Sequence, residues 1–245
     1  MRKVNNILSI KRRVLKKFIS LTPNFIKPGL RLMYSLYLSF RVHWRDLTTY
    51  RRSCEGLHRY WREPNGENKP ETYFKNSERS QYLVRLMKKY ASTDTRILEI
   101  GCNVGRNLNH LFCAGFRNLA GVEINKKALS LMKKHYSEMA ETIIVYNAPI
   151  ENAIKNFKDN AFDVVFTMAV LEHIHPQSKF IFPEIVRITR KYLITIEDEH
   201  DVSWRHFPRN YKRIFESFAM RQIYQFNGRI GNLPGSFWVR VFFKK

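Results

Sequence analysis

The stretch that decides the fold is "RILEIGCNVGRNL", residues 96–108. Apolar residues run into a loop that carries Gly101 and Gly105, and a helix-like pattern follows at once. A glycine loop between a strand and a helix lets the backbone approach a ligand closely and directs helix N–H groups toward it. The pattern therefore predicts a ligand-binding turn after the first strand of an α/β domain.

Predicted strands and helices alternate from residue 95 onward, which is typical of a parallel sheet covered by helices on both faces. We expect strands at residues 96–100, 119–122, 142–146, 162–167 and 192–196, and helices at residues 107–114, 126–138, 150–155, 177–189 and 210–218. The last two strands, 220–226 and 238–243, are joined without a helix and must pair antiparallel. The prediction is a Rossmann-like, mostly parallel seven-stranded sheet with a C-terminal antiparallel hairpin.

Two acids indicate which ligand the loop holds. Glu123 ends the second predicted strand, where an acid typically binds ribose hydroxyls. A nicotinamide dinucleotide would call for a third glycine at position 103, where this chain has Asn103. Glu99 precedes the loop and would repel a pyrophosphate, but it suits a ligand that carries an ammonium group. S-adenosylmethionine has that group and no phosphate, so the residues favour it.

The segments "ILEIGCNVGRNL", "GVEIN", "YNAPIE" and "FDVVFTMAVLEHIHP" resemble, in order and spacing, the class I S-adenosylmethionine-dependent methyltransferases over residues 92–245. The resemblance implies that the loop around the methionine moiety consists of Glu99, Gly101, Cys102, Asn103 and Gly105. It implies that Glu123 binds the ribose and that Ile124 forms an apolar wall for adenine. Asn147 and Ala148 would contact the adenine edge, and Met168 and Ala169 would line the pocket after the fourth strand.

Asn103 and Asn147 depart from the family pattern, which commonly has a glycine and an aspartate at these places. Asparagine tolerates left-handed backbone angles better than other non-glycine residues. Asn147 keeps an oxygen that can accept a hydrogen bond from the adenine amine. We expect cofactor binding to survive both changes.

Methyl transfer to a hydroxyl requires alignment of the acceptor and usually a base that removes its proton. The candidates follow the fourth and fifth predicted strands: Glu172 and His173 in "LEHIHP", and His200 in "IEDEHDVSW". The alternative interpretation of His173 is a structural histidine at the start of the next helix.

The segment "IEDEHDVSW" also resembles the one after the fifth strand of metal-dependent sugar O-methyltransferases, in which a Glu-Asp pair binds magnesium. Glu197 and Asp198 are the corresponding pair here. Those enzymes draw a further aspartate from the end of the fourth strand, where this chain has Thr167 and Met168. We expect no metal, with a Mg²⁺ site at Glu197 and Asp198 as the alternative.

The net charge of +22 is concentrated at the N-terminus, because residues 1–90 carry 21 Lys and Arg against 6 Asp and Glu. Residues 3–21 predict a basic amphipathic helix, which either lies on an anionic membrane surface or packs on the protein itself. No apolar stretch reaches the roughly 20 residues that span a bilayer. Three separated cysteines favour a reducing, cytoplasmic setting. We expect a basic helical extension at 1–60, a linker and cap helix at 61–91, and the cofactor domain at 92–245.

These patterns predict a transferase that O-methylates a small molecule, a sugar or a lipid-linked glycan as a peripheral membrane protein at the cytoplasmic face. One alternative is an RNA methyltransferase whose basic N-terminal region binds phosphates, although no RNA-binding module is recognisable. A further alternative is a non-catalytic protein that keeps the fold and the cofactor.

Overall fold

The computed structural model describes residues 53–75, 77–231, 233 and 236–245. The predicted helix at 3–21 and most of the predicted extension at 1–60 lie outside the described residues. Within the described part, no helix combines the length and the apolar character that a membrane span requires.

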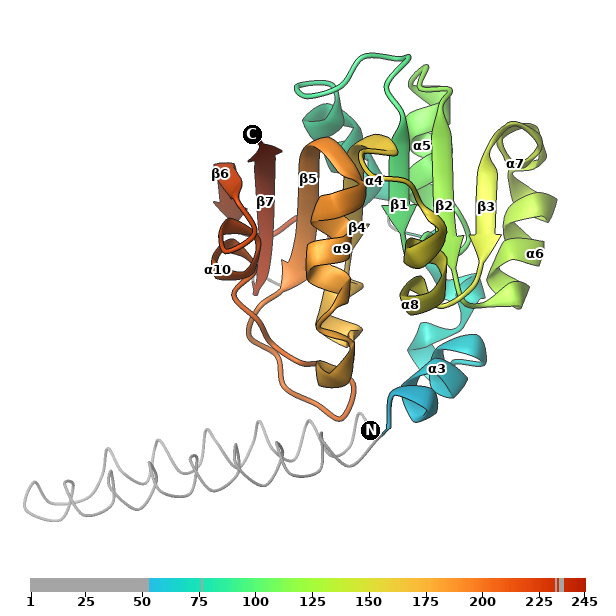
Figure 1. Ribbon diagram of the computed structural model, residues 1–245. Helices are drawn as coiled ribbons and strands as arrows, with labels where there is room; N and C mark the ends of the chain where they lie inside the picture. The colour runs from blue at the N-terminus through green and yellow to red at the C-terminus, as the bar shows by residue number, and fades with distance from the viewer. Residues whose placement is uncertain (1–52, 76, 232, 234–235) are drawn as a thin grey trace, which may run out of the picture. The chain divides into compact units, whose positions relative to one another are not determined.

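A seven-stranded sheet forms the centre of the molecule (Figure 1). Its strands are β1 Ile97–Ile100, β2 Leu119–Glu123, β3 Ile144–Asn147, β4 Phe162–Met168, β5 Thr189–Asp198, β6 Met220–Asn227 and β7 Phe237–Lys244. The strand order is β3-β2-β1-β4-β5-β7-β6. The first five strands are parallel, whereas β7 pairs antiparallel with both β5 and β6. The predicted sheet and its C-terminal hairpin are confirmed.

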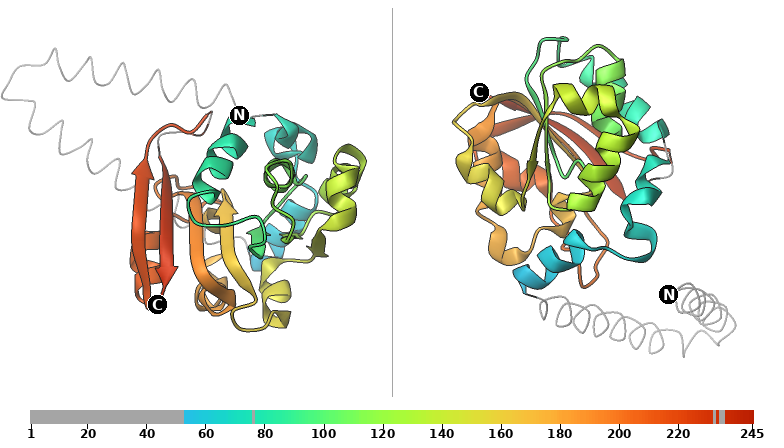
Figure 2. Two further views of the ribbon diagram at one scale, coloured as in Figure 1. Left: turned by 90° about the horizontal axis from the view of Figure 1, so that it is seen from above. Right: turned by 90° about the vertical axis from the view of Figure 1, so that its right-hand side faces the viewer.

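Helices cover both faces of the sheet, as the right-hand view of Figure 2 shows. One face packs against α4 Ser77–Met87, α5 Arg106–Cys113, α6 Lys126–His135 and α7 Ser137–Thr142, and the other against α8 Ile150–Ala153, α9 Ile181–Ile188 and α10 Tyr211–Glu216. Successive side chains of β1 point to opposite faces of the sheet. Ile97 belongs to the hydrophobic cluster on the first face, and Leu98 and Ile100 belong to the cluster on the second. Strands that are buried on both faces read as continuous apolar runs, which is why β1 was recognisable.

Two predicted helices differ from the observed ones. The helix expected at 126–138 breaks at Tyr136, whose φ of −131° and ψ of 51° are not helical. The chain then continues as α7 through Thr142, so β3 begins later than expected. The helix expected at 177–189 is confined to α9, preceded by the short 3₁₀ turn η5 Pro176–Ser178. Local apolar periodicity does not register a one-residue break of this kind.

Residues 53–75 were expected to end an extension and begin a linker, but they form structure that packs on the sheet domain. They comprise α3 Cys54–Arg62 and the 3₁₀ turns η1 Gly66–Asn68 and η2 Pro70–Phe74. The predicted boundary at residue 60 therefore falls inside α3. Ser53 caps this helix by accepting a hydrogen bond from the Gly56 amide at 3.1 Å. Figure 1 shows α3 beyond the carboxyl ends of the parallel strands.

The loop after β1 uses left-handed backbone at three positions. Gly101, Asn103 and Gly105 have φ angles of 75°, 48° and 73°. The left-handed conformation expected of Asn103 is thus present. Gly101 is also short of space, since a Cβ at this position would lie 2.5 Å from Cγ2 of Val170. The loop after β1 therefore packs directly on the loop after β4.

We expect Gly101→Ala to lower the free energy of unfolding by about 2–4 kcal/mol. About 1–2 kcal/mol comes from the left-handed backbone and the rest from overpacking against Val170. Gly66→Ala is the matched control, because Gly66 has a φ of 61° but a Cβ there would meet nothing within 4 Å. Denaturant unfolding measures both values, and equal losses would contradict the packing argument.

Candidate functional site

A cavity opens at the carboxyl ends of the parallel strands, beside the point where the strand order reverses between β1 and β4. Ligands of open α/β sheets bind at such a switch point. Most of the predicted cofactor residues line it, namely Glu99, Gly101, Cys102, Asn103, Glu123, Ile124, Ala148, Met168 and Ala169. The opposite wall comes from residues 53–79 and consists of His58, Trp61, Pro64, Tyr73 and Arg79.

Gly105 and Asn147 were predicted to contact the cofactor but do not line this cavity. Gly105 is the N-cap of α5, and a Cβ on it would lie 2.5 Å from Sδ of Met132. Asn147 donates a hydrogen bond from Nδ2 to the carbonyl of Glu123 at 2.9 Å. Both residues thus shape the loops around the cavity, and Asn147 joins the ends of β2 and β3.

Glu99 is a buried carboxyl with one oxygen left for a ligand. Its Oε1 accepts a hydrogen bond from Nδ2 of Asn107 at 2.7 Å, whereas its buried Oε2 has no partner within the described residues. Burial raises the pKa of Glu99 to about 8. A buried acceptor without a partner is costly, and a ligand ammonium would satisfy it. The residue therefore fits the ammonium of S-adenosylmethionine.

Glu123 connects the loops on either side of the cavity. Its Oε2 accepts a hydrogen bond from the Asn103 amide at 2.8 Å, and its Oε1 accepts one from the Asn125 amide at 2.7 Å. The side-chain oxygen of Asn103 is buried without a partner in the described part of the chain. Burial raises the pKa of Glu123. Two buried acids in one cavity fit a ligand with an ammonium and hydroxyls better than one with a pyrophosphate.

His173 is the predicted catalytic residue that lines the cavity. Its Nδ1 lies 2.8 Å from the carbonyl oxygen of Arg205, which can only accept, so Nδ1 carries the proton and Nε2 presents a lone pair. Burial lowers the pKa of His173 well below its ordinary range, and the ring is neutral near pH 7. Its centroid lies 4.6 Å from that of Trp61. The geometry gives His173 the form that a general base needs.

Glu172 and His200 lie away from the cavity lining. Glu172 is buried, its Oε2 accepts from the Asp198 amide at 2.5 Å, and its Oε1 lies 3.6 Å from Nε2 of His173. Burial and the neighbouring Glu197 raise the pKa of Glu172 to about 9, so it is protonated at neutral pH. His200 accepts a hydrogen bond from Nε1 of Trp238 at 3.3 Å. Glu172 therefore positions the turn that carries His173, and His200 does not reach the site.

Glu197 and Asp198 do not fit the magnesium site that their sequence motif suggested. Glu197 is fully buried; its Oε2 accepts from the amides of Val170 and Glu172 at 2.9 and 3.3 Å, and its Oε1 has no partner among the described residues. A carboxylate buried to this degree leaves no room for the several waters that Mg²⁺ usually keeps. Asp198 accepts from two amides of its own loop through Oδ1 and from the Ser236 hydroxyl through Oδ2. These carboxylates hold the backbone of their loops together.

Several cavity residues had no counterpart among the sequence predictions: His58, Trp61, Tyr73, Arg79 and Glu151. Most come from the segment that was expected to be a linker. Arg79 lies at the start of α4, and its guanidinium matches the carboxylate of S-adenosylmethionine. Such residues reach the site only because residues 53–79 fold back over it, which local sequence patterns do not reveal.

Comparisons with known proteins agree with this architecture. Residues 98–193 match the family model described as a methyltransferase domain. A ubiquinone biosynthesis O-methyltransferase of Actinobacillus pleuropneumoniae is 26% identical over 153 residues, which are 56% of this chain and 64% of that enzyme. The chain thus matches slightly less than two thirds of its curated relative.

Solved structures share the fold. A SAM-dependent methyltransferase from Aquifex aeolicus superposes with a TM-score of 0.56 at 13% identity, covering 73% of this chain and 98% of that one. A 1,6-didemethyltoxoflavin-N1-methyltransferase from Burkholderia thailandensis, with 1,6-didemethyltoxoflavin and S-adenosylhomocysteine bound, gives 0.58 at 12% identity, with 71% and 82% covered.

The sheet order and the acid-lined glycine loop fit S-adenosylmethionine as the ligand. Residues 98–193 match a methyltransferase domain, and the sheet domain has the fold of S-adenosylmethionine-dependent methyltransferases.

The raised pKa of Glu99 predicts that the affinity for S-adenosylmethionine depends on pH. Its carboxyl, with a pKa of about 8, is protonated at lower pH, and it must release that proton to bind an ammonium. The association constant should therefore rise by up to about tenfold per unit as the pH increases toward 8. Above that it should fall, because the ligand's own α-ammonium, with an ordinary pKa of about 7.7–8.0, loses its proton.

Calorimetric titration across this pH range measures the effect. In Glu99→Gln the rising limb should disappear and the falling limb should remain. A rising limb of equal slope in the variant would assign the linkage to another group.

Proposed function

We propose that this chain transfers the methyl group of S-adenosylmethionine to an oxygen atom of a small, hydroxyl-bearing acceptor. The match of residues 98–193 to a methyltransferase domain supports the reaction class, and the curated relative carries the name of an O-methyltransferase. The neighbour with bound 1,6-didemethyltoxoflavin is a methyltransferase of the same fold whose structure holds a small molecule. The proposal that the methyl group goes to an oxygen atom depends on the pair formed by His173 and Trp61.

His173 and Trp61 together match the hydrogen-bonding capacity of a hydroxyl. Nε2 of His173 offers a lone pair, while Nε1 of Trp61 is a buried donor without a partner in the described part of the chain. A hydroxyl donates one hydrogen bond and accepts others, so it can satisfy both rings at once. The two rings both line the cavity, where the wall from residues 53–79 meets the turn after β4, with centroids 4.6 Å apart. This observation carries the proposal.

Methyl transfer to a hydroxyl requires the protein mainly to align the acceptor with the cofactor and to remove the hydroxyl proton. When bound, the cofactor supplies a methyl group on a sulfonium, which is a good leaving group. Glu99 and Glu123 orient the ligand from the strand ends, and the wall from residues 53–79 excludes water. His173 accepts the hydroxyl proton at Nε2 as the oxygen attacks, and its hydrogen bond to the Arg205 carbonyl keeps the ring in place.

Aromatic rings around Trp61 suit an acceptor with a flat or apolar part. The Trp61 ring meets Tyr60 edge to face at 5.1 Å, and Tyr60 meets Trp204 at 4.8 Å. The guanidinium of Arg205 lies 5.7 Å from the centroid of Trp61 and adds a positive charge. An aromatic, sugar or lipid-linked acceptor that bears an anionic group would match these features.

The basic N-terminal region supports a location at the cytoplasmic face of a membrane, as a peripheral protein. Its predicted amphipathic helix, residues 3–21, combines an apolar stripe with Arg and Lys on the other side. A lipid-linked glycan is the acceptor that this location favours. Magnesium is not part of the proposal, because Glu197 and Asp198 are held by protein donors.

The decisive assay incubates the purified full chain with methyl-labelled S-adenosylmethionine and separate lipid, glycan, small-metabolite and RNA fractions. Base-labile or ether-type label on a non-nucleic-acid fraction supports the proposal. Label on RNA would instead favour the alternative that the net charge of +22 suggests, a phosphate-binding RNA methyltransferase. Cofactor binding without any transfer would point to a non-catalytic protein.

We expect His173→Gln to lower kcat by about 10²–10⁴-fold, because it removes the proton acceptor. Affinity for S-adenosylmethionine, measured by calorimetry, should stay within about threefold. Since burial lowers the pKa of His173, kcat of the native enzyme at saturating S-adenosylmethionine should hold as the pH falls to about 6.5 and decline only below that value. An unchanged kcat in the variant would remove His173 from the chemistry.

Trp61→Phe keeps the ring and deletes the N–H donor, so it serves as the milder companion variant. We expect kcat/KM to fall by about tenfold, the equivalent of one hydrogen bond to the acceptor. A change in cofactor affinity without a change in kcat/KM would show that the ring acts on the cofactor side.

Deleting residues 1–45 should abolish co-sedimentation with vesicles that contain anionic phospholipid, because it removes the basic amphipathic helix. Replacing Arg12, Arg13, Lys16 and Lys17 by Gln in the full chain is the matched variant and should weaken the same binding. Full vesicle binding after both changes would contradict the membrane location and leave the methyl transfer untouched.

A further inference from the structure

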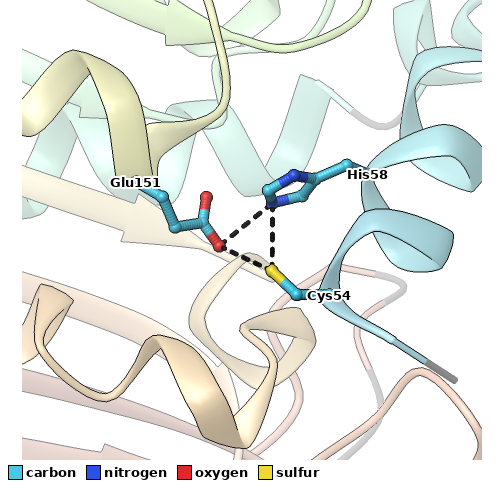
Figure 3. A group of neighbouring side chains, drawn as sticks. All are labelled: Cys54, His58 and Glu151. Atoms are coloured by element: carbon cyan, nitrogen blue, oxygen red, sulfur yellow. Dashed lines mark hydrogen bonds and ion pairs between the residues drawn. The ribbon is translucent and has the colours of Figure 1, made fainter.

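Three side chains with metal-binding chemistry converge at the rim of the cofactor cavity, outside the residues used for methyl transfer (Figure 3). Cys54 and His58 lie one turn apart on α3, and Glu151 comes from α8. Nε2 of His58 lies 3.6 Å from Sγ of Cys54 and 3.1 Å from Oε1 of Glu151. The third distance, from Sγ to Oε1, is 3.9 Å. All three side chains point at one common space.

The convergence on a single nitrogen distinguishes this group from a nucleophilic triad. In a Cys–His–carboxylate relay, the thiol and the carboxylate bind opposite nitrogens of the imidazole ring. Here both Cys54 and Glu151 approach Nε2 of His58. Ligands of one cation, by contrast, must face the same point.

The distances agree with a tetrahedral ion. Zinc lies about 2.3 Å from sulfur, about 2.0–2.1 Å from imidazole nitrogen and about 2.0–2.2 Å from carboxylate oxygen. At tetrahedral angles these bonds separate sulfur from nitrogen by about 3.5–3.6 Å, sulfur from oxygen by about 3.5–3.7 Å, and nitrogen from oxygen by about 3.3–3.5 Å. The observed 3.6, 3.1 and 3.9 Å need only a small rotation of the Glu151 carboxylate.

Neighbouring groups are arranged as outer partners of such ligands. The Ser178 hydroxyl lies 3.4 Å from Sγ of Cys54 and can donate to a thiolate. A carboxylate oxygen of Glu55 lies 4.0 Å from Nδ1 of His58, the nitrogen that a metal at Nε2 leaves protonated. Metal-binding histidines commonly donate their second ring N–H to a carboxylate. The side chains of His58 and Glu151 keep exposed fractions of 17% and 11%, which leaves a path for an ion.

We propose that Cys54, His58 and Glu151 form a transition-metal site of the zinc type that fastens α3 onto α8. Sulfur, nitrogen and oxygen donors in tetrahedral array suit Zn²⁺. Binding replaces the thiol proton of Cys54, which leaves to solvent, and the protein supplies three of four ligands. His58 and Glu151 also line the cavity, so the fourth position opens toward it and takes water or an acceptor oxygen. The site does not depend on the proposed methyl transfer.

Cobalt provides a direct test, because a thiolate ligand gives bound Co²⁺ an intense near-ultraviolet charge-transfer band. The full chain, freed of metal with a chelator, should bind one Co²⁺ with this band, and added Zn²⁺ should displace it. The second His and carboxylate group, Glu172, His173 and His206, contains no sulfur and cannot produce the band. Absence of the band in the folded native chain would overturn the proposal.

Single variants assign the ligands. Cys54→Ser should abolish the band, and His58→Gln and Glu151→Gln should each lower the Co²⁺ affinity by more than about 100-fold, since direct ligands matter more than outer partners. Cys113→Ser is the matched control, because Cys113 is an exposed free thiol on α5. Circular dichroism checks that each variant is folded. A band that survives Cys54→Ser would assign the thiolate elsewhere and refute the site.

Proteolysis tests separately whether the bound metal holds α3 in place. Trypsin cleaves after Arg59 and Arg62 of α3 only when the helix opens locally. Zn²⁺ should slow this cleavage by at least about tenfold in the native chain and have no effect in Glu151→Gln, which cuts the link to α8. Equal protection in both proteins would show that α3 is not held through Glu151, and it would contradict the proposed clamp even if cobalt binds.

Discussion

Glu123 holds the cofactor site together by accepting amide hydrogen bonds from the loop after β1 and from the loop after β2. These loops carry Asn103 and Asn125, and their backbones would otherwise leave buried N–H groups without acceptors. A carboxylate in such a position cannot be replaced by an apolar residue without leaving those donors unsatisfied. The same residue is the one predicted to bind the ribose, so its observed structural role and its predicted binding role fall on one side chain.

A second network of carboxyls fixes the other wall of the cavity. Glu197 and Glu172 are buried next to each other, and burial raises the pKa of both, to about 7 and about 9. Between them they accept amide hydrogen bonds from Val170, Glu172 and Asp198, and so they join the turn after β4 to the end of β5. This arrangement sets the place of His173, whose tautomer is then fixed by the Arg205 carbonyl. The acidic run after β5 therefore serves backbone positioning rather than metal binding.

The cover over the cavity supplies the residues on which the proposed acceptor recognition depends. A glycine loop with an acid at each strand end binds the cofactor but does not select an acceptor. Trp61 and His58 of α3 and Tyr73 of η2 close the opposite wall, and Cys54 and His58 bring that wall to Glu151 of α8. The position of α3 thus links acceptor recognition, exclusion of water and the proposed metal site.

The sequence by itself determined the sheet and was enough to predict the cofactor. Buried parallel strands appear as continuous apolar runs, and the left-handed positions of Gly101, Asn103 and Gly105 are encoded by residue types that tolerate such angles. Only the tertiary structure decided the roles of residues 53–79, the break of the helix at Tyr136 and the loop contacts of Glu172, Glu197 and Asp198. These features depend on which distant groups meet across the fold, and short-range periodicity carries no information about such contacts. Neighbouring residues largely determine local conformation, whereas the function of a buried polar side chain depends on the partners that packing brings to it.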